Sequence, residues 1–342
     1  MLLRNLISRG MNRIIIIFFS LLSINQTMMA DQFDTIFAIA KRAPSSHNAQ
    51  MWKIEKIDSC ECTIFIDNSV CLPQIDPNNR ESWISIGAFV ENCVDIGCDL
   101  GYDIAVQKYP QKVQLRIVGR KKEENLYIPL INNRHTSRIS FERKILDKQL
   151  LQFNNCLYIP RLCEQGQKIA DNIFDANKQQ IGNKKKAKEL SEWMITSHKE
   201  LHDRKDGLTP DMLGMHGFKK FLFLSLFNKH SIQSSQFEKQ YLSSTRQQLD
   251  NCSGFLILFS KRQSREDDWF NTGRELERIW LDLTKKQIAV HPMSQSIEEL
   301  DFYNNLKIIL NDERDVQMIL RVGYTKSSLK NDTCSKRREI HL

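Results

Sequence analysis

The sequence predicts an α+β protein that consists of two related halves. Short apolar runs with the spacing of β-strands occur in both parts of the chain, together with two long helical patterns. The two helical patterns share the spacing W-x-x-x-G-x-x-x-E, which begins at Trp83 and again at Trp269. A pattern repeated in this way indicates an internal duplication. Strands and helices in both halves are expected to form sheets covered by helices.

The individual elements follow from the periodicity of apolar residues. Residues 33–43 have helical spacing that ends before Pro44, because proline disfavours helix in the residue that precedes it. Each long helix carries a one-sided apolar stripe, with Gly87 or Gly273 near its middle. A glycine inside a helix costs about 1 kcal/mol relative to alanine, so both indicate close approach of another backbone or a ligand. Strands are predicted over residues 52–57, 62–66, 114–118, 256–259 and 317–324.

Composition argues against several classes of protein. Hydrophobic residues make up 41% and charged residues 26% of the 342 residues, which is typical of a soluble globular fold. The net charge is +8, but the basic clusters at 184–188 and 336–338 lack the interleaved aromatic residues of a nucleic-acid-binding face. The nine cysteines are scattered, without the spacing of a zinc or C-x-x-C site. We therefore expect neither a nucleic-acid partner nor a metal site.

The first 30 residues have the pattern of a secretory leader. Arg13 precedes an apolar run over residues 14–24, and small and polar residues follow up to Ala30. The run is short for a transmembrane span. An uncleaved anchor or a buried helix is the alternative. We expect export to the periplasm, with the cytoplasm as the alternative location, and no stable membrane insertion beyond this leader.

The chain divides into the leader at 1–30, a first half at 31–131 and a second half at 132–342. The second half contains a polar, irregular helical stretch at about 184–248, which we call the helical insertion. It includes a turn signal at 206–210 and an apolar stretch at 218–227. The helical insertion is either a lid over a pocket or an ordinary surface insertion.

The densest chemical signal is a turn at residues 42–50, which we call the polar turn. Its side chains offer hydrogen-bond donors and acceptors within a few residues. Serine and asparagine are also common in ordinary turns, so composition alone leaves both a ligand site and a plain turn open. The polar side chains of the turn are Arg42, Ser45, Ser46, His47, Asn48 and Gln50.

Residues 44–52, P-S-S-H-N-A-Q-M-W, closely resemble the P-S-S-x-N-x-Q-P-W segment of FMN-dependent nitroreductases. The His-Asn pair is similar to the Acg-type branch of that family, in which two repeats are fused. The segment lies against the flavin in such enzymes, so the resemblance implies that the polar turn contacts FMN. Met51 departs from the family's proline, which loosens the entry to the strand but removes no polar contact.

A second motif, R-H-T-S-R at residues 134–138 with Phe141 after it, resembles the R-R-S-x-R-x-F opening of nitroreductases with one residue inserted. Arg134, Thr136 and Arg138 then match the positions that hold the FMN phosphate. Guanidinium groups bind phosphate through paired, charge-assisted hydrogen bonds, which agrees with that role. Without the family match, a basic solvated loop is the simpler interpretation.

Weaker matches lie toward the C-terminus. Residues 317–324 resemble the family's L-G-Y strand, and Arg337 and Arg338 its C-terminal basic pair, which could reach the same phosphate. Disordered surface charge is the alternative for this pair. Residues 291–295 resemble an Acg-type P-x-x-Q turn, which makes Gln295 a weaker candidate for a flavin contact. The second half lacks a clear copy of the polar turn, so one flavin per chain is expected.

The resemblance covers residues 34–338 and implies a nitroreductase-like fold, with two halves fused as an intramolecular pseudo-dimer and mixed, mainly antiparallel sheets flanked by helices. The chain is then a monomer or a weak homodimer. NAD(P)H would dock transiently and pass hydride through FMN to a nitro compound, quinone or similar small-molecule acceptor. No side chain stands out as a catalytic acid or base. The alternatives are a protein that sequesters flavin without turnover, and a non-enzymatic envelope protein.

Overall fold

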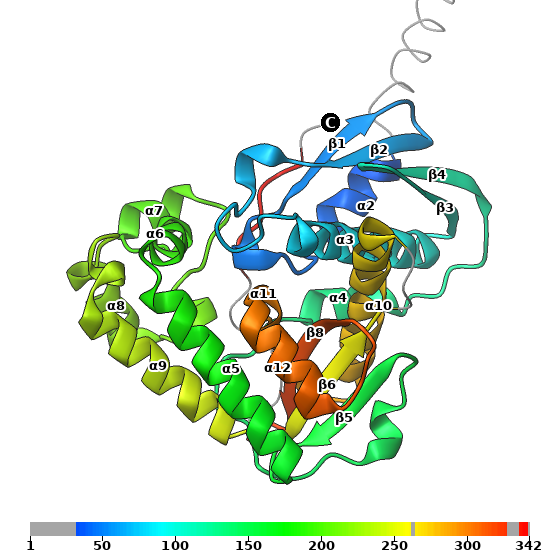
Figure 1. The fold of residues 1–342 in the computed structure, drawn as a ribbon. Helices are drawn as coiled ribbons and strands as arrows, with labels where there is room; N and C mark the ends of the chain where they lie inside the picture. Colours follow the sequence, from blue (N-terminus) through cyan, green and yellow to red (C-terminus); the bar gives the residue numbers. More distant parts are fainter. Residues whose placement is uncertain (1–31, 261–263, 327–334, 341–342) are drawn as a thin grey trace, which may run out of the picture.

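Two four-stranded antiparallel sheets form the framework of the molecule (Figure 1). The computed structural model describes residues 32–260, 264–326 and 335–340. The strand order is β1-β2-β4-β3 in the first sheet and β5-β6-β8-β7 in the second, so the two sheets have the same connectivity. The strands are β1 (Trp52–Lys56), β2 (Glu61–Ile66), β3 (Tyr102–Tyr109), β4 (Lys112–Arg120), β5 (Cys156–Pro160), β6 (Gly254–Phe259), β7 (Ala289–Pro292) and β8 (Val316–Gly323).

Helices α3 and α10 lie between the two sheets, and the helical insertion lies to one side of them (Figure 1). The α-helices are α2 (Gln32–Ala40), α3 (Arg80–Asp99), α4 (Tyr127–Asn133), α5 (Glu164–Gly182), α6 (Lys184–Trp193), α7 (His198–Asp203), α8 (Gly217–Leu226), α9 (Ser235–Asp250), α10 (Arg265–Lys285), α11 (Gln295–Glu298) and α12 (Leu300–Leu310). Short 3₁₀ turns are η1 (Ser46–Asn48), η2 (Asn68–Val70), η3 (Lys148–Leu151), η4 (Asp211–Leu213) and η5 (Ser231–Gln233).

The five strands predicted from the sequence are confirmed within a few residues as β1, β2, β4, β6 and β8. The strands β3, β5 and β7 were not predicted. Strand β3 places one buried residue, Ile104, among partly exposed and exposed ones, so its apolar pattern is weak. Strand β7 is four residues long, too short to show a period. Pairing with stronger neighbouring strands, rather than local pattern, decides these three.

The two mid-helix glycines meet where α3 and α10 cross. A Cβ atom placed on Gly87 would lie 2.9 Å from the Cα of Gly273 and closer still to the carbonyl oxygen of Phe270. A Cβ on Gly273 would likewise lie 2.9 Å from the Cα of Gly87 and closer to the carbonyl oxygen of Ile84. The expected close approach of another backbone is confirmed.

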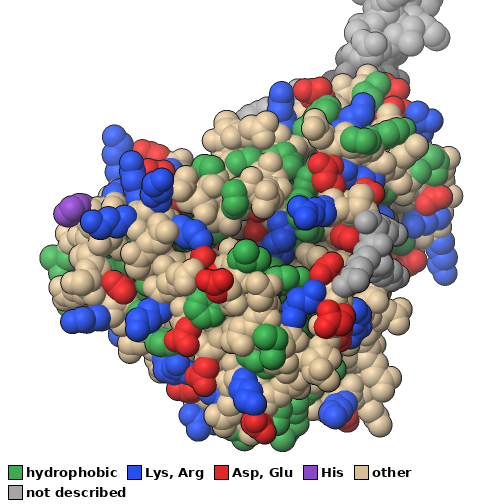
Figure 2. All heavy atoms as spheres, in the orientation of Figure 1, with side chains coloured by type: hydrophobic (Ala, Val, Ile, Leu, Met, Phe, Trp, Pro, Cys, Tyr) green, Lys and Arg blue, Asp and Glu red, His purple; other side chains and the backbone are tan. Residues whose placement is uncertain are grey.

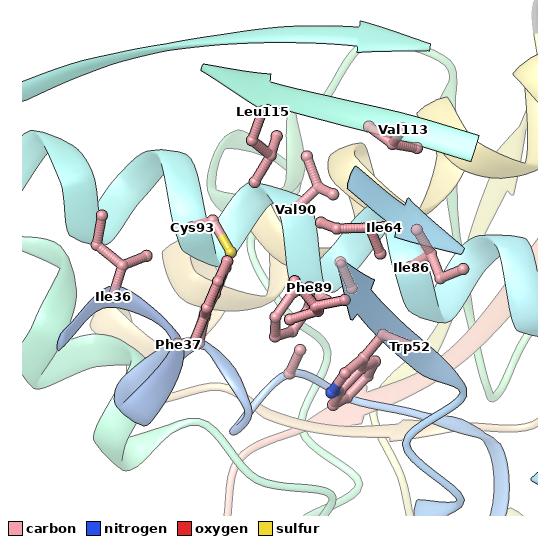
Figure 3. Packing of buried hydrophobic residues seen from close by; sticks show 14 of the residues in the cluster. Ile36, Phe37, Trp52, Ile64, Ile86, Phe89, Val90, Cys93, Val113 and Leu115 are labelled. Atoms are coloured by element: carbon pink, nitrogen blue, oxygen red, sulfur yellow. The ribbon is translucent and has the colours of Figure 1, made fainter. Parts of the chain in front are cut away.

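The prediction of a one-sided stripe is wrong for α3, which is buried on nearly all sides. Its residues Ile86, Phe89 and Val90 face the first sheet and α2, where the rings of Phe37, Phe89 and Trp52 stack in sequence (Figure 3). The far side of α3 meets α10. A helix enclosed in this way buries its polar residues too, and its burial therefore exceeds what its apolar spacing predicts.

Polar groups inside this interface include a cluster of carboxylates. Glu91 of α3 accepts a hydrogen bond from Arg274 Nε of α10 at 2.6 Å and pairs also with Arg278. Asp95 lies one turn further along α3, buried, and its Oδ2 has no hydrogen-bond partner among the described residues. Burial, followed by the nearby charges of Glu91 and Glu277, raises the pKa of Asp95 to about 8.

This pKa predicts a loss of stability as the pH rises. Between the ordinary pKa of 3.8 and about 8, the folded protein keeps the Asp95 proton while the unfolded chain releases it. The free energy of unfolding should therefore fall by at least about 1 kcal/mol between about pH 5 and about pH 8, and Asp95→Asn should flatten this fall. Urea unfolding of both proteins at the two pH values measures it. An equal fall in the variant would contradict the assignment to Asp95.

The helical insertion has an apolar cluster of its own. Residues from α6, α8, η5 and α9 pack together around Phe223 and Phe237. The cluster is separate from the clusters that cover the two sheets. The predicted helical character of 184–248 is thus confirmed.

The predicted leader at 1–30 lies outside the described residues, so export stays a prediction. Within 32–260, 264–326 and 335–340, no helix combines the length and the apolar character that a membrane span requires. In the same part of the chain, the eight described cysteines form no disulfide bond, and no group of side chains has the composition of a metal site.

Candidate functional site

Two adjoining cavities meet at the polar turn. The larger has a volume of about 900 Å³ and lies between α3, α10, the β7–α11 connection and the helical insertion. The smaller, of about 70 Å³, is lined by the polar turn, the 134–138 motif and the C-terminal segment. Ser45, His47, Thr136 and Arg138 line both cavities. The fold therefore brings the polar turn and the 134–138 motif to one place, although the two are separated by the entire first sheet in the sequence.

The polar turn has an unusual backbone. His47, Asn48 and Gln50 have φ angles of 50°, 57° and 54°, in the left-handed region that few residues other than glycine adopt. Local bonds hold this shape, since the Gln50 amide donates to Ser45 Oγ at 3.0 Å and Gln50 Nε2 donates to the Asn48 carbonyl at 3.1 Å. Strained backbone of this kind is frequent at binding sites, where the surrounding structure stabilises it.

Asn48 and Gln50 are bonded to the chain itself. Asn48 Nδ2 donates to the carbonyls of Gly207 at 3.1 Å and Lys336 at 3.2 Å. Gln50 Nε2 also donates to the carbonyl of Lys205 at 2.9 Å, and its Oε1 accepts from the Arg338 amide at 2.8 Å. Asn48 lines only the smaller cavity, and Gln50 lines neither. Both side chains fasten the polar turn to the helical insertion and to the C-terminal segment.

The C-terminal basic pair is ordered against the polar turn rather than free at the surface. Arg337 donates to the Lys41 carbonyl at 2.9 Å and to Asn48 Oδ1, and it lines the smaller cavity. Arg338 donates to the carbonyls of Ala49 and Gln50 and lines neither cavity. The structure thus separates the two arginines, with Arg337 beside the cavity and Arg338 bracing the backbone of the turn.

Arg134 is buried in an ion pair. Its Nε lies 2.9 Å from Glu277 Oε1, and its guanidinium carbon lies 4.7 Å from the centre of the Trp280 ring. It also donates to the carbonyl of Arg42. Burial raises the pKa of Glu277 to about 7, and the charge of Arg134 opposes that rise. Arg134 lines the smaller cavity, but much of its charge is balanced inside the protein.

Arg138 is the contrasting case. Its Nη1 donates to the carbonyl of Met212 at 3.0 Å, and among the described residues it makes no ion pair. Burial lowers its pKa to about 10, so the side chain stays charged at neutral pH. A half-buried guanidinium without a carboxylate partner, at the junction of two cavities, is suited to bind an anion. Arg42 lies at the edge of the smaller cavity and donates to the Asn132 carbonyl at 2.9 Å.

Uncharged polar groups line the larger cavity. The Nδ1 atoms of His47 and His291 and the Oε1 atom of Gln295 are buried without a hydrogen-bond partner in the described part of the chain. Burial, with the nearby charge of Arg138, lowers the pKa of His47 to about 4. Burial, followed by the charges of Arg321 and Arg138, lowers the pKa of His291 well below its usual value. Both imidazoles are therefore neutral at neutral pH. Buried polar atoms usually have hydrogen-bond partners, so three such atoms without one around a single cavity fit a site for a polar ligand.

A pair of carboxyl groups on the cavity wall was missed by the sequence reasoning. Ser294 Oγ donates to Glu298 Oε1 at 2.6 Å, and Gln180 Nε2 donates to Glu298 Oε2 at 2.6 Å. Glu81 of α3 also lines this cavity, and burial raises its pKa to about 7. The two residues lie on α3 and α11, which are far apart in the sequence, so no local sequence pattern predicts the pair. His291 was missed as well, although it begins the 291–295 segment.

The structure therefore places the predicted residues in four groups. Ser46 and Gln295 line the larger cavity, and Ser45, His47, Thr136 and Arg138 line both. Arg42, Asn48, Arg134 and Arg337 line the smaller one. Gln50 and Arg338 line neither. The helical insertion contributes residues from α6, α8 and α9 to the wall of the larger cavity.

Comparisons with known proteins give partial similarity. No protein-family model matches the chain. Two proteins of Mycobacterium tuberculosis strains, named as NAD(P)H nitroreductase candidates, are each 31% identical to it over 81 residues, or 24% of this chain. The matched stretch spans about a quarter, 23%, of the length of these relatives.

Two solved structures also align with it. The FMN-dependent nitroreductase NfnB from Mycobacterium smegmatis, in complex with NADPH, has 14% sequence identity and a TM-score of 0.36, covering 62% of this chain and 94% of that one. The FMN- and NADPH-dependent nitroreductase NfnB from a Sphingopyxis strain has 12% identity and a TM-score of 0.37, covering 61% and 93%.

Proposed function

We propose that the protein binds FMN and acts as an NAD(P)H-dependent oxidoreductase of the nitroreductase kind. The observation that carries this proposal is the meeting of the polar turn and Arg138 at two adjoining cavities. Both segments resemble the flavin-contacting motifs of nitroreductases. The partial similarity to NAD(P)H nitroreductases supports the same function.

The smaller cavity suits the phosphate of FMN. Arginine side chains from the polar turn, the 134–138 motif and the C-terminal segment surround it, together with the hydroxyls of Ser45 and Thr136. Arg138 would provide the principal charge, because Arg134 is already paired with Glu277. Arg134, Asn48, Gln50 and Arg338 would act by holding the walls of the site in place.

The larger cavity suits the flavin ring and a second molecule beside it. Its volume of about 900 Å³ is near the upper end of the usual range for ligand pockets, about 300–1,000 Å³. Ser46, His47, His291 and Gln295 would offer hydrogen bonds to the polar edge of the ring. The remaining space would accept NAD(P)H and the acceptor, a nitro compound, quinone or similar small molecule.

The bound flavin would supply hydride transfer, while the chain binds, orients and shields it. The residues around the larger cavity divide these tasks. The neutral imidazoles add no positive charge beside Arg138. Glu81, which pairs with Arg80 and whose pKa burial raises, would be the group that exchanges a proton at the cavity wall.

The two halves would form an intramolecular pseudo-dimer. The identical strand order of the two sheets and the glycine crossing of α3 and α10 support a duplication, with the boundary near residue 131. One flavin per chain is expected, because the polar turn occurs once.

We expect the purified protein to be yellow or to become yellow with added FMN, and NADPH or NADH to bleach the flavin absorption. The expectation follows from a site that fits the cofactor and a cavity with room for the donor. The measurement is a visible absorption spectrum before and after anaerobic addition of each donor, with free FMN as the control. A colourless protein that takes up no FMN would remove the proposal.

A storage protein for FMN is the second candidate, and the position of the helical insertion favours it. Residues of α6, α8 and α9 form one wall of the larger cavity, which would limit the access of donors to a bound flavin. A flavin that stays bound but is never bleached by NADPH or NADH would select storage over turnover.

A further inference from the structure

Helix α8 carries an apolar face without a partner. Phe218, Phe221, Leu222 and Leu226 are 73%, 55%, 38% and 68% exposed. Their spacing of three and four residues places them on one side of the helix, and the opposite side is buried in the helical insertion through Phe223 and Leu224. Single exposed apolar residues are ordinary, but a contiguous apolar face indicates an interaction surface.

The helical insertion that carries this face has a net positive charge. Residues 184–248 contain twelve Lys and Arg against seven Asp and Glu, and so hold five of the eight net positive charges of the chain. Lys and Arg side chains gather on the side of the molecule where α6, α7 and α8 lie (Figure 2). Lys219 lies exposed within α8 itself. An apolar helix face flanked by cations is the pattern of a helix that lies in the surface of a bilayer.

The larger cavity reaches the surface at the same helix. Lys219, Leu222 and Leu226 are exposed and also line that cavity. The wall behind them is apolar, formed by Leu190, Met194, Phe223 and Phe227. A molecule that enters beside α8 therefore contacts apolar side chains before it reaches the polar groups near Arg138.

We propose that α8 docks the protein on an anionic lipid surface. A second copy of the chain fits this face less well, because it would bring two cationic helical insertions together. Lipid headgroups complement the charge, and the acyl region complements the apolar face. One consequence rests on the proposed function: the electron acceptor would be lipophilic and would enter the larger cavity from the bilayer.

The test is flotation of the full chain with vesicles of phosphatidylglycerol and phosphatidylcholine, or of phosphatidylcholine alone. The wild type should float with the anionic vesicles and much less with the neutral ones, and high salt should weaken this binding. The double variant Phe218→Ser, Phe221→Ser should bind anionic vesicles about tenfold more weakly. These two residues line neither cavity, so the variant should keep its FMN affinity.

The matched control is Leu300→Ser, Ile308→Ser on α12, where two apolar side chains are 72% and 77% exposed. This variant should bind vesicles like the wild type. Absence of wild-type binding, or equal binding by the α8 variant, would overturn the proposal. So would a concentration-dependent dimer that the α8 variant abolishes, which would assign the face to a second copy. Vesicle binding is measured with and without FMN, so the result can be interpreted even if the protein does not bind flavin.

Discussion

Substitution of Arg138 by alanine is expected to weaken FMN binding by about tenfold to a hundredfold. Each hydrogen bond between charged groups contributes about 1.5–3 kcal/mol. Arg138 lies at the junction of the two cavities and makes no ion pair with the described residues, so its charge is available to the phosphate. The side chain bonds to the protein through the Met212 carbonyl, so its loss should leave the fold intact. Fluorescence titration of FMN into the apoprotein measures the affinity, and thermal unfolding checks the fold.

Two other arginines provide the controls for this experiment. Arg116→Ala removes an exposed side chain that pairs with Glu61 on the first sheet and lines neither cavity, so FMN affinity should not change. Arg134→Ala leaves Glu277 buried without its partner and should lower the stability by about 3–5 kcal/mol. If Arg138→Ala bound FMN as tightly as the wild type, the phosphate would have to lie elsewhere.

Gly87→Ala is expected to destabilise the protein by about 3 kcal/mol or more, enough to prevent folding of much of the chain. The added methyl group would lie 2.9 Å from the Cα of Gly273 and overlap the carbonyl oxygen of Phe270. Both are backbone atoms, which cannot rotate away as a side chain can. The helices would have to separate, and the contact between the two halves would be lost along their length. Soluble yield and urea unfolding give the measurement.

Gly182→Ala is the matched control, since it is also a glycine in a helix. A Cβ at this position has no neighbouring atom within 4 Å, and the substitution should be neutral or stabilise by up to about 1 kcal/mol. Gly273→Ala should behave like Gly87→Ala, because the same crossing excludes both methyl groups. Normal stability of the Gly87 variant would show that the helices cross less closely than the structure has them.

The sequence predicted part of the candidate site. The polar turn and Arg138 were predicted from the resemblance to nitroreductases, with which their chemistry agrees, and Ser45, His47 and Arg138 line both cavities. The individual roles could not be read in the same way. Arg134 and Arg138 are four residues apart and chemically identical, yet one is paired with Glu277 on α10 and the other is not. A partner from a distant helix leaves no trace in the local pattern.

Local chemistry alone fixed the two glycine positions, the strong strands and the hydrogen-bonding content of the polar turn, because each depends on residues close together in the chain. Tertiary packing decided which of the polar side chains face a cavity and which brace the backbone, as with Asn48 and Gln50. It also created the Glu81 and Glu298 pair and the burial that raises the pKa of Glu81. These properties depend on desolvation and on neighbours from other helices, and only the folded chain brings those neighbours together.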